Sequence, residues 1–322
     1  KCYTTNIGID ARFFDRFGVT IDLYNKNTSD LLYYAPLPNI SGYTGQYKNV
    51  GAINNKGLEI SLNADVIRTS KFQWTSDFNI GFNRNRVTEL YGGKPELKGL
   101  KRLEEGRDMD EWYLREWAGV DPANGSPLWY TTDENGKRTT TDSYNKADRV
   151  YCGSAAPKFT GGWMNSFSYK GFTLTANFDF VYGNLLYNQS RELLDSDGAY
   201  ADYNSMKLKS GWKRWEKEGD IATHPKAING GNKNSNKSSS RYLEKGNYFS
   251  LRNLSLGYSI PEKLCGKLGL QQVNVSCSAD NLFTLTPFSG VSPQLSDSST
   301  DGYAGTIYPL SRRIVFGLNV SF

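Results

Sequence analysis

The residues best suited to binding chemistry lie in one long polar segment, residues 188–242. It carries Tyr200, Tyr203, Trp212 and Trp215 among interspersed arginine, lysine, aspartate and glutamate side chains. Flat aromatic rings with hydrogen-bonding neighbours suit a sugar ring or a peptide side chain. Trp212 and Trp215 are also one helical turn apart, so the alternative interpretation is a short helix that packs its own tryptophans inside the segment. The segment is therefore a candidate surface for a substrate or a partner.

Metal and catalytic chemistry have weaker support. Asp195 and Asp197 offer two carboxylates at the i, i+2 spacing of calcium loops, but no later glutamate completes such a site. A solvated turn is the competing interpretation. The only histidine, His224, lies in a polar stretch, and the four cysteines form no CxxC pair. We therefore expect no enzyme, no zinc or redox site and no cofactor, with calcium as the one alternative.

The elements that must position these residues are strands with a period of two. In residues 311–322 the apolar side chains alternate with small or polar ones. One face carries Ile314, Phe316, Leu318, Val320 and Phe322, and the other carries Val315, Gly317, Asn319 and Ser321. A strand of about ten residues with one apolar face is the unit of a transmembrane β-barrel. The sequence contains no run of about 18 apolar residues, so it predicts no membrane helix.

The same alternation predicts about eleven strands. They span residues 4–13, 19–23, 58–66, 72–83, 112–119, 126–132, 159–169, 172–187, 247–260, 271–285 and 310–322. Single-chain bacterial barrels have even strand numbers, so eleven strands are not expected to close alone. We expect an all-β fold, a transmembrane antiparallel β-barrel, in which about eleven strands form part of a 22-stranded barrel.

Composition favours a membrane barrel over a soluble β-sandwich, the main alternative. Mean hydropathy is −0.58, but aromatic residues make up 14% of the chain and many flank short turns. Examples are Phe14, Phe17, Phe72, Trp74, Tyr169, Phe172 and Tyr258. Such aromatic girdles mark the two interfaces of a bilayer. The net charge of +5 is spread along the chain, so a nucleic-acid partner is not expected.

Loop lengths predict the orientation. Short connections near residues 15–16, 68–71 and 170–171 and after Pro261 alternate with long ones at residues 29–55, 89–110, 188–242 and 287–309. Short turns face the periplasm and long loops face outside. The first strand then descends and Lys1 lies outside, provided that a strand such as residues 126–132 lies between residues 119 and 159. With no export signal at the start, we expect residues 1–322 to be the carboxyl-terminal part of a longer polypeptide.

A second set of candidate residues belongs to the strands themselves. Asn83, Asn85, Asp280 and Thr284 fall on the polar faces of strands near their outer ends. Such side chains could hydrogen-bond a passing solute, water molecules or a plug domain, and the sequence leaves these three alternatives open.

Several short motifs together resemble a known family. Along the chain, they are Tyr24-Asn25-Lys26-Asn27-Thr28 with Asp30-Leu31-Leu32, Asn49-Val50-Gly51 with Ile53 and Asn55-Lys56-Gly57-Leu58-Glu59, Pro157-Lys158-Phe159-Thr160-Gly161-Gly162-Trp163, Tyr169-Lys170-Gly171-Phe172, Tyr248-Phe249-Ser250-Leu251-Arg252-Asn253-Leu254-Ser255-Leu256-Gly257-Tyr258, Asp280-Asn281-Leu282-Phe283-Thr284, and Tyr308-Pro309-Leu310 through Phe322. The set resembles SusC-like TonB-dependent outer-membrane transporters of Bacteroidetes-type bacteria, and covers the carboxyl-terminal half of their barrel.

This resemblance implies a function. It predicts TonB-dependent import of an oligomeric nutrient across the outer membrane, together with a SusD-like surface lipoprotein. The plug and the TonB contact would lie in an amino-terminal part missing here. Glycans are the more common cargo and oligopeptides the alternative; a passive porin and an outer-membrane barrel enzyme are the competing classes. Phe322 resembles the terminal aromatic signal that is read during barrel assembly.

Overall fold

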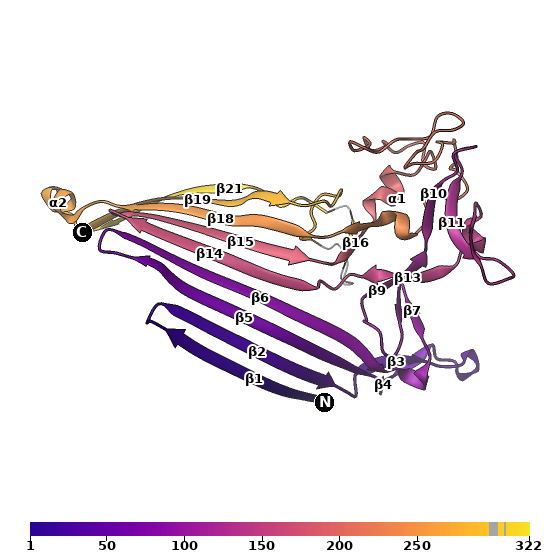
Figure 1. Ribbon diagram of the computed structural model, residues 1–322, viewed down its shortest axis with the longest axis horizontal. Coiled ribbons are helices and arrows are strands. Elements are labelled where there is room, and N and C mark those ends of the chain that lie inside the picture. The colour runs from indigo at the N-terminus through magenta and orange to yellow at the C-terminus, as the bar shows by residue number, and fades with distance from the viewer. Residues whose placement is uncertain (296–301, 306) are drawn as a thin grey trace.

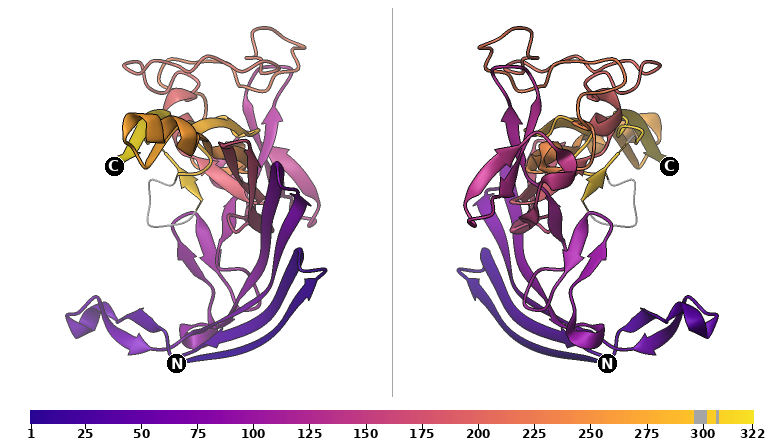
Figure 2. Two further views of the ribbon diagram at one scale, coloured as in Figure 1. Left: turned by 90° about the vertical axis from the view of Figure 1, so that its left-hand side faces the viewer. Right: turned by 90° about the vertical axis from the view of Figure 1, so that its right-hand side faces the viewer.

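One large antiparallel sheet dominates the computed structural model, which describes residues 1–295, 302–305 and 307–322. In the described residues this sheet has nine strands, which we call the wall (Figure 1). In sheet order they are β1 (Cys2–Phe13), β2 (Phe17–Thr28), β5 (Ala52–Arg68), β6 (Phe72–Glu89), β14 (Phe159–Tyr169), β15 (Phe172–Tyr182), β18 (Tyr248–Ser259), β19 (Gln272–Leu285) and β21 (Arg313–Ser321). Seen end on, the wall is a curved arc with β1 at one edge and β21 at the other (Figure 2).

The register of the wall places apolar residues side by side on one face. Ile21 of β2 pairs with Ile60 of β5, which pairs with Ile80 of β6. Towards the other edge, Phe316 and Leu318 of β21 are 80% and 70% exposed. So large an exposed apolar surface is stable against lipid and not against water. The expected transmembrane barrel wall, with alternating lipid-facing and lumen-facing side chains, is confirmed.

Aromatic side chains gather at the short-turn end of the wall. The rings of Phe72 and Tyr169 lie 6.4 Å apart, and those of Phe172 and Tyr258 stack at 4.3 Å. Trp74 Nε1 donates a hydrogen bond to Asn165 Oδ1 at 3.1 Å. The predicted girdle therefore forms at the end where the chain makes its tight turns.

The predicted number of eleven wall strands is wrong, because two of the predicted strands lie elsewhere. Residues 112–119 and 126–132 form parts of β9 (Glu111–Arg115), β10 (Trp117–Val120) and β11 (Pro127–Thr132). These strands alternate because one face packs into protein: Trp112 and Trp129 are fully buried. A period of two does not distinguish that packing from contact with lipid. Nine strands, like eleven, are an odd number, so the predicted direction of β1 from the outside towards the periplasm is unchanged. Lys1 still lies at the long-loop end (Figure 1).

The long connections form a second region, the outer assembly, made of residues 29–51, 90–158, 183–247 and the described part of 286–312. Its small sheets are β3 (Leu32–Pro36) with β4 (Gly45–Asn49), β10–β11–β12 (Arg138–Thr141), β13 (Arg149–Ser154)–β9–β8 (Lys101–Leu103)–β7 (Glu96–Lys98), and β17 (Leu243–Lys245)–β16 (Leu185–Asn188)–β20 (Tyr303–Ala304). The predicted loop 287–309 includes residues 296–301 and 306, which lie outside the described residues.

Helices are short throughout the described residues. They are α1 (Ser190–Leu194) and α2 (Glu262–Cys265), with 3₁₀ turns η1 (Asn39–Ser41), η2 (Tyr91–Gly93), η3 (Tyr144–Lys146), η4 (Ser240–Tyr242) and η5 (Gly266–Leu268). None of the helices that the structure describes is long and apolar enough to cross a membrane.

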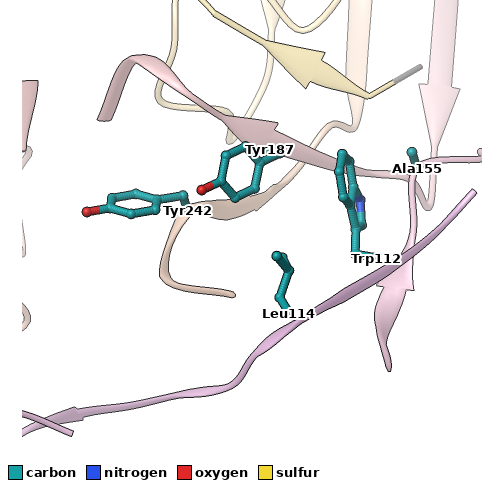
Figure 3. Packing of buried hydrophobic residues seen from close by; sticks show 5 residues of the cluster. All are labelled: Trp112, Leu114, Ala155, Tyr187 and Tyr242. Atoms are coloured by element: carbon teal, nitrogen blue, oxygen red, sulfur yellow. The ribbon is translucent and has the colours of Figure 1, made fainter. Parts of the chain in front are cut away.

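The main hydrophobic core lies in the outer assembly (Figure 3). It consists of Trp112, Leu114, Ala155, Tyr187 and Tyr242, which come from four separate segments of the chain. The ring centroids of Trp112 and Tyr187 are 5.8 Å apart, and Trp112 Nε1 donates to the Leu185 carbonyl at 3.0 Å. Burial of the two tyrosines raises the pKa of both phenols. The long loops are therefore a packed structure in their own right.

Candidate functional site

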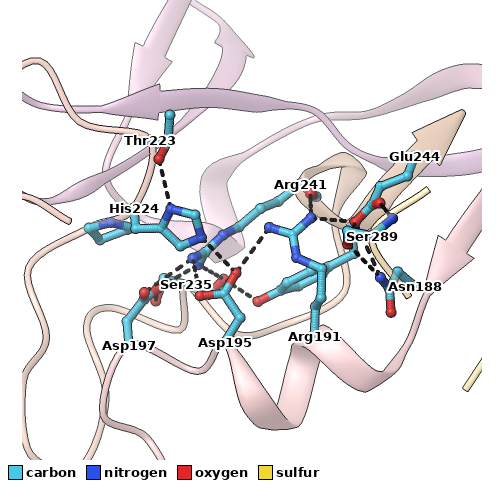
Figure 4. Close-up of polar contacts among 12 residues, drawn as sticks. Asn188, Arg191, Asp195, Asp197, Thr223, His224, Ser235, Arg241, Glu244 and Ser289 are labelled. Carbon is cyan, nitrogen blue, oxygen red and sulfur yellow. Dashed lines mark hydrogen bonds and ion pairs between the residues drawn. The ribbon is translucent and has the colours of Figure 1, made fainter. Parts of the chain in front are cut away.

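A group of buried charges connects the segments of the outer assembly (Figure 4). It consists of Arg191, Asp195, Asp197, Arg214, His224, Arg241 and Glu244, and we call it the arginine–aspartate cluster. Three guanidinium groups meet three carboxylates, so the charges of arginines and acids balance. The carboxylates of Asp195 and Asp197 are completely buried, and the Arg241 side chain is 3% exposed. Buried ions at this density persist only when they are paired.

Asp197 is the most fully bonded member. Its Oδ1 accepts hydrogen bonds from Arg214 Nη1 at 2.7 Å and from Arg241 Nη2 at 3.1 Å. Its Oδ2 accepts one from Ser235 Oγ at 2.6 Å and another from Arg241 Nη1. Arg241 extends from η4, more than forty positions along the chain. Asp197 therefore ties the segment after α1 to the segment that leads back into the wall.

Asp195 joins α1 to the histidine. Its Oδ2 accepts from Arg191 Nη2 and from His224 Nε2, both at 2.9 Å. Burial alone would raise the pKa of this carboxyl, but the His224 hydrogen bond and the charges of Arg241 and Arg191 outweigh it. The pKa of Asp195 consequently lies below its ordinary value, and the carboxylate remains ionised.

His224, which the sequence placed in a polar loop, is buried. Its Nδ1 lies 2.8 Å from Thr223 Oγ1, and that hydroxyl donates to the Lys213 carbonyl. One ring nitrogen therefore faces a carboxylate and the other faces a hydroxyl. The histidine thus cross-links Asp195 to Thr223, which is itself bonded to the Lys213 backbone.

The arrangement argues against calcium at Asp195 and Asp197. Their oxygens face guanidinium groups and His224, whereas a calcium site needs carboxylates that converge on an open position. Across the described residues, no group of three or more acidic, histidine or cysteine side chains is arranged to hold a metal.

The two tryptophans are integral to this packing. The Trp212 ring lies under the Arg191 guanidinium, 4.5 Å from centroid to carbon, and 5.0 Å from the His224 ring. Trp215 is 8% exposed and donates from Nε1 to the Pro122 carbonyl at 2.9 Å. Residues 211–216 form no helix, so the helical alternative is wrong. Trp212 packs on residues of its own segment, whereas Trp215 is buried against the Pro122 turn from another segment.

The two tyrosines, by contrast, are accessible. Tyr200 and Tyr203 are 40% and 55% exposed, and their ring centroids lie 5.4 Å apart. They line a shallow cleft of about 210 Å³ together with Asp197. The Tyr200 hydroxyl accepts a hydrogen bond from Asn236 Nδ2 at 3.2 Å. A pair of rings beside polar groups is a surface that a sugar or a peptide side chain could contact.

The predicted lumen residues are held by cross-strand hydrogen bonds. Tyr24 Oη donates to Asn83 Oδ1 at 3.1 Å, within the wall. Asn85 Oδ1 instead accepts from the backbone N–H of Met109 at 3.2 Å, so it ties the wall to the outer assembly. Both asparagines line a cleft of about 960 Å³ between the end of β6 and the outer assembly. This cleft does not include the tyrosine pair.

The remaining candidates lie near the carboxyl terminus. Asp280 accepts from Asn253 Nδ2 at 2.7 Å and from Arg313 Nε at 2.9 Å, and Thr284 Oγ1 donates to Ser250 Oγ at 3.2 Å. Phe322 follows β21 and is 87% exposed. Its proposed role in assembly stays a prediction.

Sequence reasoning missed most of the arginine–aspartate cluster. The i, i+4 pair Arg191 and Asp195 was visible in the sequence as a helical salt-bridge spacing. Arg241 and Glu244 lie about fifty positions further along the chain, and no local sequence pattern links them to the Arg191–Asp195 pair.

The fold and the outer assembly define a class: the wall of an outer-membrane β-barrel with large ordered outer loops. Residues 3–282 match the family model described as TonB dependent receptor-like, beta-barrel. TonB-dependent receptor P3 of Formosa agariphila is 30% identical over 98% of this chain and 34% of its own length. TonB-dependent receptor SusC of Bacteroides thetaiotaomicron is 24% identical over 100% of this chain and 32% of its own.

Solved structures of similar fold point to the same family. The RagAB peptide transporter superposes with a TM-score of 0.86 at 28% identity, covering 100% of this chain and 35% of that one. The RagAB peptide importer in its open-open state gives a TM-score of 0.80 at 26% identity, covering 100% and 34%.

The chain belongs to the TonB-dependent receptor family, as part of its outer-membrane β-barrel, and the resemblance to the SusC-like branch is confirmed. This is a family of transporters and receptors, not of enzymes. The chain spans about a third of the length of the relatives that it matches.

Proposed function

We propose that the complete protein imports an oligomeric nutrient across the outer membrane, driven by TonB through a part of the protein beyond this chain. The observation that carries the proposal is the packed outer assembly on the barrel wall. A connection of more than fifty residues is far longer than the usual four to six, and such loops are functional when ordered. Here they are fixed by a hydrophobic core and buried ion pairs.

A surface lipoprotein of the SusD type is the partner that we propose for this outer assembly. Support comes from the relatives, which include SusC, and from the similarity to RagAB. The exposed Tyr200 and Tyr203 lie on the outer assembly, where a lid or its cargo would make contact.

The cargo class is proposed as an oligosaccharide or an oligopeptide. The structural neighbours are described as peptide transporters, which strengthens the oligopeptide alternative. The tyrosine pair suits both classes, because an aromatic face binds a sugar ring or an apolar side chain equally well.

The test uses the full-length protein in its native membrane. Gentle extraction should recover a stoichiometric lipoprotein with it, and Tyr200→Ala with Tyr203→Ala should lower cargo uptake or lid association. Ile221→Ala, at an exposed loop residue, is the matched control. Feeding defined oligopeptides and oligosaccharides to a deletion strain identifies the cargo by which uptake is lost.

The competing function is a passive porin. Uptake that continues after removal of TonB, by a barrel recovered without a lipoprotein, would establish the porin and refute the import proposal.

Deletion of Phe322 is a separate test of assembly: the amount of folded protein in the outer membrane should fall while synthesis continues. Normal assembly would refute that role.

A further inference from the structure

Three cations lie together on the lipid-facing side of the wall at its outer end. Lys56 of β5 stands directly opposite Arg84 of β6, and Arg86 follows two residues further along β6 on the same face. All three side chains are exposed. They share this face with Leu58 and Phe82, which form the next cross-strand pair towards the membrane centre.

These cations have no acidic partner within the part of the chain that the structure describes. No ion pair, hydrogen bond or ring contact joins the side chains of Lys56, Arg84 or Arg86 to a described residue. By contrast, Arg313 on the lumen face is paired with Asp280 at 2.7 Å. Like charges placed directly opposite on a sheet destabilise it. Within the described residues no anion contacts the cluster, so its charges are available to an anion from outside the chain.

The height of the cluster identifies where that anion lies. On β6 the lipid-facing row runs from Phe72, in the girdle, to Phe82, immediately below Arg84. Ten residues at about 3.3 Å each, tilted by about 40°, span about 25 Å, the height of the apolar band of an outer-membrane barrel. Lys56, Arg84 and Arg86 consequently reach the headgroup level of the outer leaflet, on the side of the long loops.

The surface there is hollowed in a suitable way. A cleft of about 490 Å³ has the three cations at its end nearest the long loops and apolar side chains at its end nearest the membrane centre. It is lined by Leu23, Asn54, Lys56, Gly57, Leu58, Phe82, Arg84 and Arg86. Asn54 is fixed by hydrogen bonds from its Nδ2 to Asn25 and Asn27, both at 2.6 Å. Cationic groups above an apolar floor match a phosphorylated headgroup above its acyl chains.

We propose that Lys56, Arg84 and Arg86 bind the phosphate of a phosphorylated glycolipid in the outer leaflet, whose acyl chains lie against Leu58 and Phe82. The guanidinium groups donate to the phosphate oxygens, and Lys56 adds a point charge. The bound lipid removes the repulsion between the opposed cations, so it stabilises the β5–β6 end of the wall.

The test measures lipid binding by the full-length protein in detergent. The probes are lipid A, the same lipid after removal of its phosphates, and inorganic phosphate, read by native mass spectrometry and by the melting temperature. Lipid A should bind and raise the melting temperature. Replacing Lys56, Arg84 and Arg86 together by Gln should weaken its binding by about a hundredfold.

Two control variants make the result specific. Lys137→Gln with Lys207→Gln and Lys217→Gln removes the same charge from exposed outer loops and should leave lipid binding unchanged. Lys56→Arg with Arg84→Lys and Arg86→Lys should retain most of it. Equal binding of dephosphorylated lipid, or equal stabilisation by inorganic phosphate, would overturn the proposal. That comparison needs only the unmodified protein, so it stands even if the triple Gln variant does not assemble.

Discussion

The wall and the outer assembly are built from the same alternating strands but are stabilised in different ways. Each strand of the wall pairs with the wall strands that come before and after it along the chain. The wall exposes its large side chains, such as Phe316, to lipid. The outer assembly joins segments far apart in sequence and buries both its aromatic core and its charges. In lipid, backbone pairing is obligatory and side chains need only be apolar. In water, the loops need a specific core to remain ordered.

This difference predicts that each region can be damaged without the other. The largest expected effect is in the outer assembly. Arg241→Met leaves three buried carboxylates facing two guanidinium groups, and this one uncompensated negative charge costs about 3–5 kcal/mol. Hydrogen exchange should show residues 190–244 opening, while the barrel keeps its resistance to detergent at room temperature. Removing the exposed Lys233–Asp142 pair is the control and should cost less than about 1 kcal/mol.

A charge on the lipid face tests the wall in turn. Ala176 lies near the middle of the apolar band on β15, and Ala176→Arg should cost about 2–4 kcal/mol. Asn177→Arg, one position on and facing the lumen, should cost much less. Unfolding in urea from lipid vesicles measures both. Equal losses for the two variants would contradict the assignment of faces.

The pH dependence should be confined to the outer assembly. Because the pKa of Asp195 is lower in the folded state, its contribution to stability is present above the ordinary aspartate value of about 3.9. It is lost as the pH falls through the lower folded value. Protease sensitivity of residues 190–244 should rise over that acidic range, with the wall unchanged. Asp195→Asn should be less stable at neutral pH and lack this part of the acid transition.

The smallest expected effect is at the junction of the two regions. Asn85→Leu removes the acceptor of the Met109 N–H and should cost about 1 kcal/mol. The amide of Met109 should then exchange faster with solvent. Asn83→Leu removes bonds to Tyr24 and Asn55, which lie within the wall, and should leave Met109 protected. Faster exchange of Met109 in both variants would show that the coupling is not local.

The wall was predictable because its signal is local. Alternation along each strand fixed the lipid face, and short turns such as the one at Lys170 fixed which strands are neighbours. The number of wall strands was overestimated because the segments around Trp112 and Trp129 alternate in the same way. Burial against protein gives the same period as contact with lipid.

The sites were less predictable because they depend on pairing across the chain. Arg84 and Lys56 face each other only through the register of β5 and β6, which includes shifts that the sequence does not reveal. Arg241 reaches Asp197 through the folding of a whole loop. The exposed Tyr200 and the buried Trp215 differ only in what the tertiary packing leaves uncovered.

Tyr303 has a consequence for the kinetics of folding. It comes from the last long connection, yet its hydroxyl accepts from the Leu100 backbone N–H at 3.2 Å, and its ring lies 5.2 Å from that of Trp112. These contacts close a loop of about two hundred residues, and such closure is entropically slow. The outer assembly should therefore mature last, after β20 has paired with β16, and the delay should appear as a late kinetic phase of protease resistance.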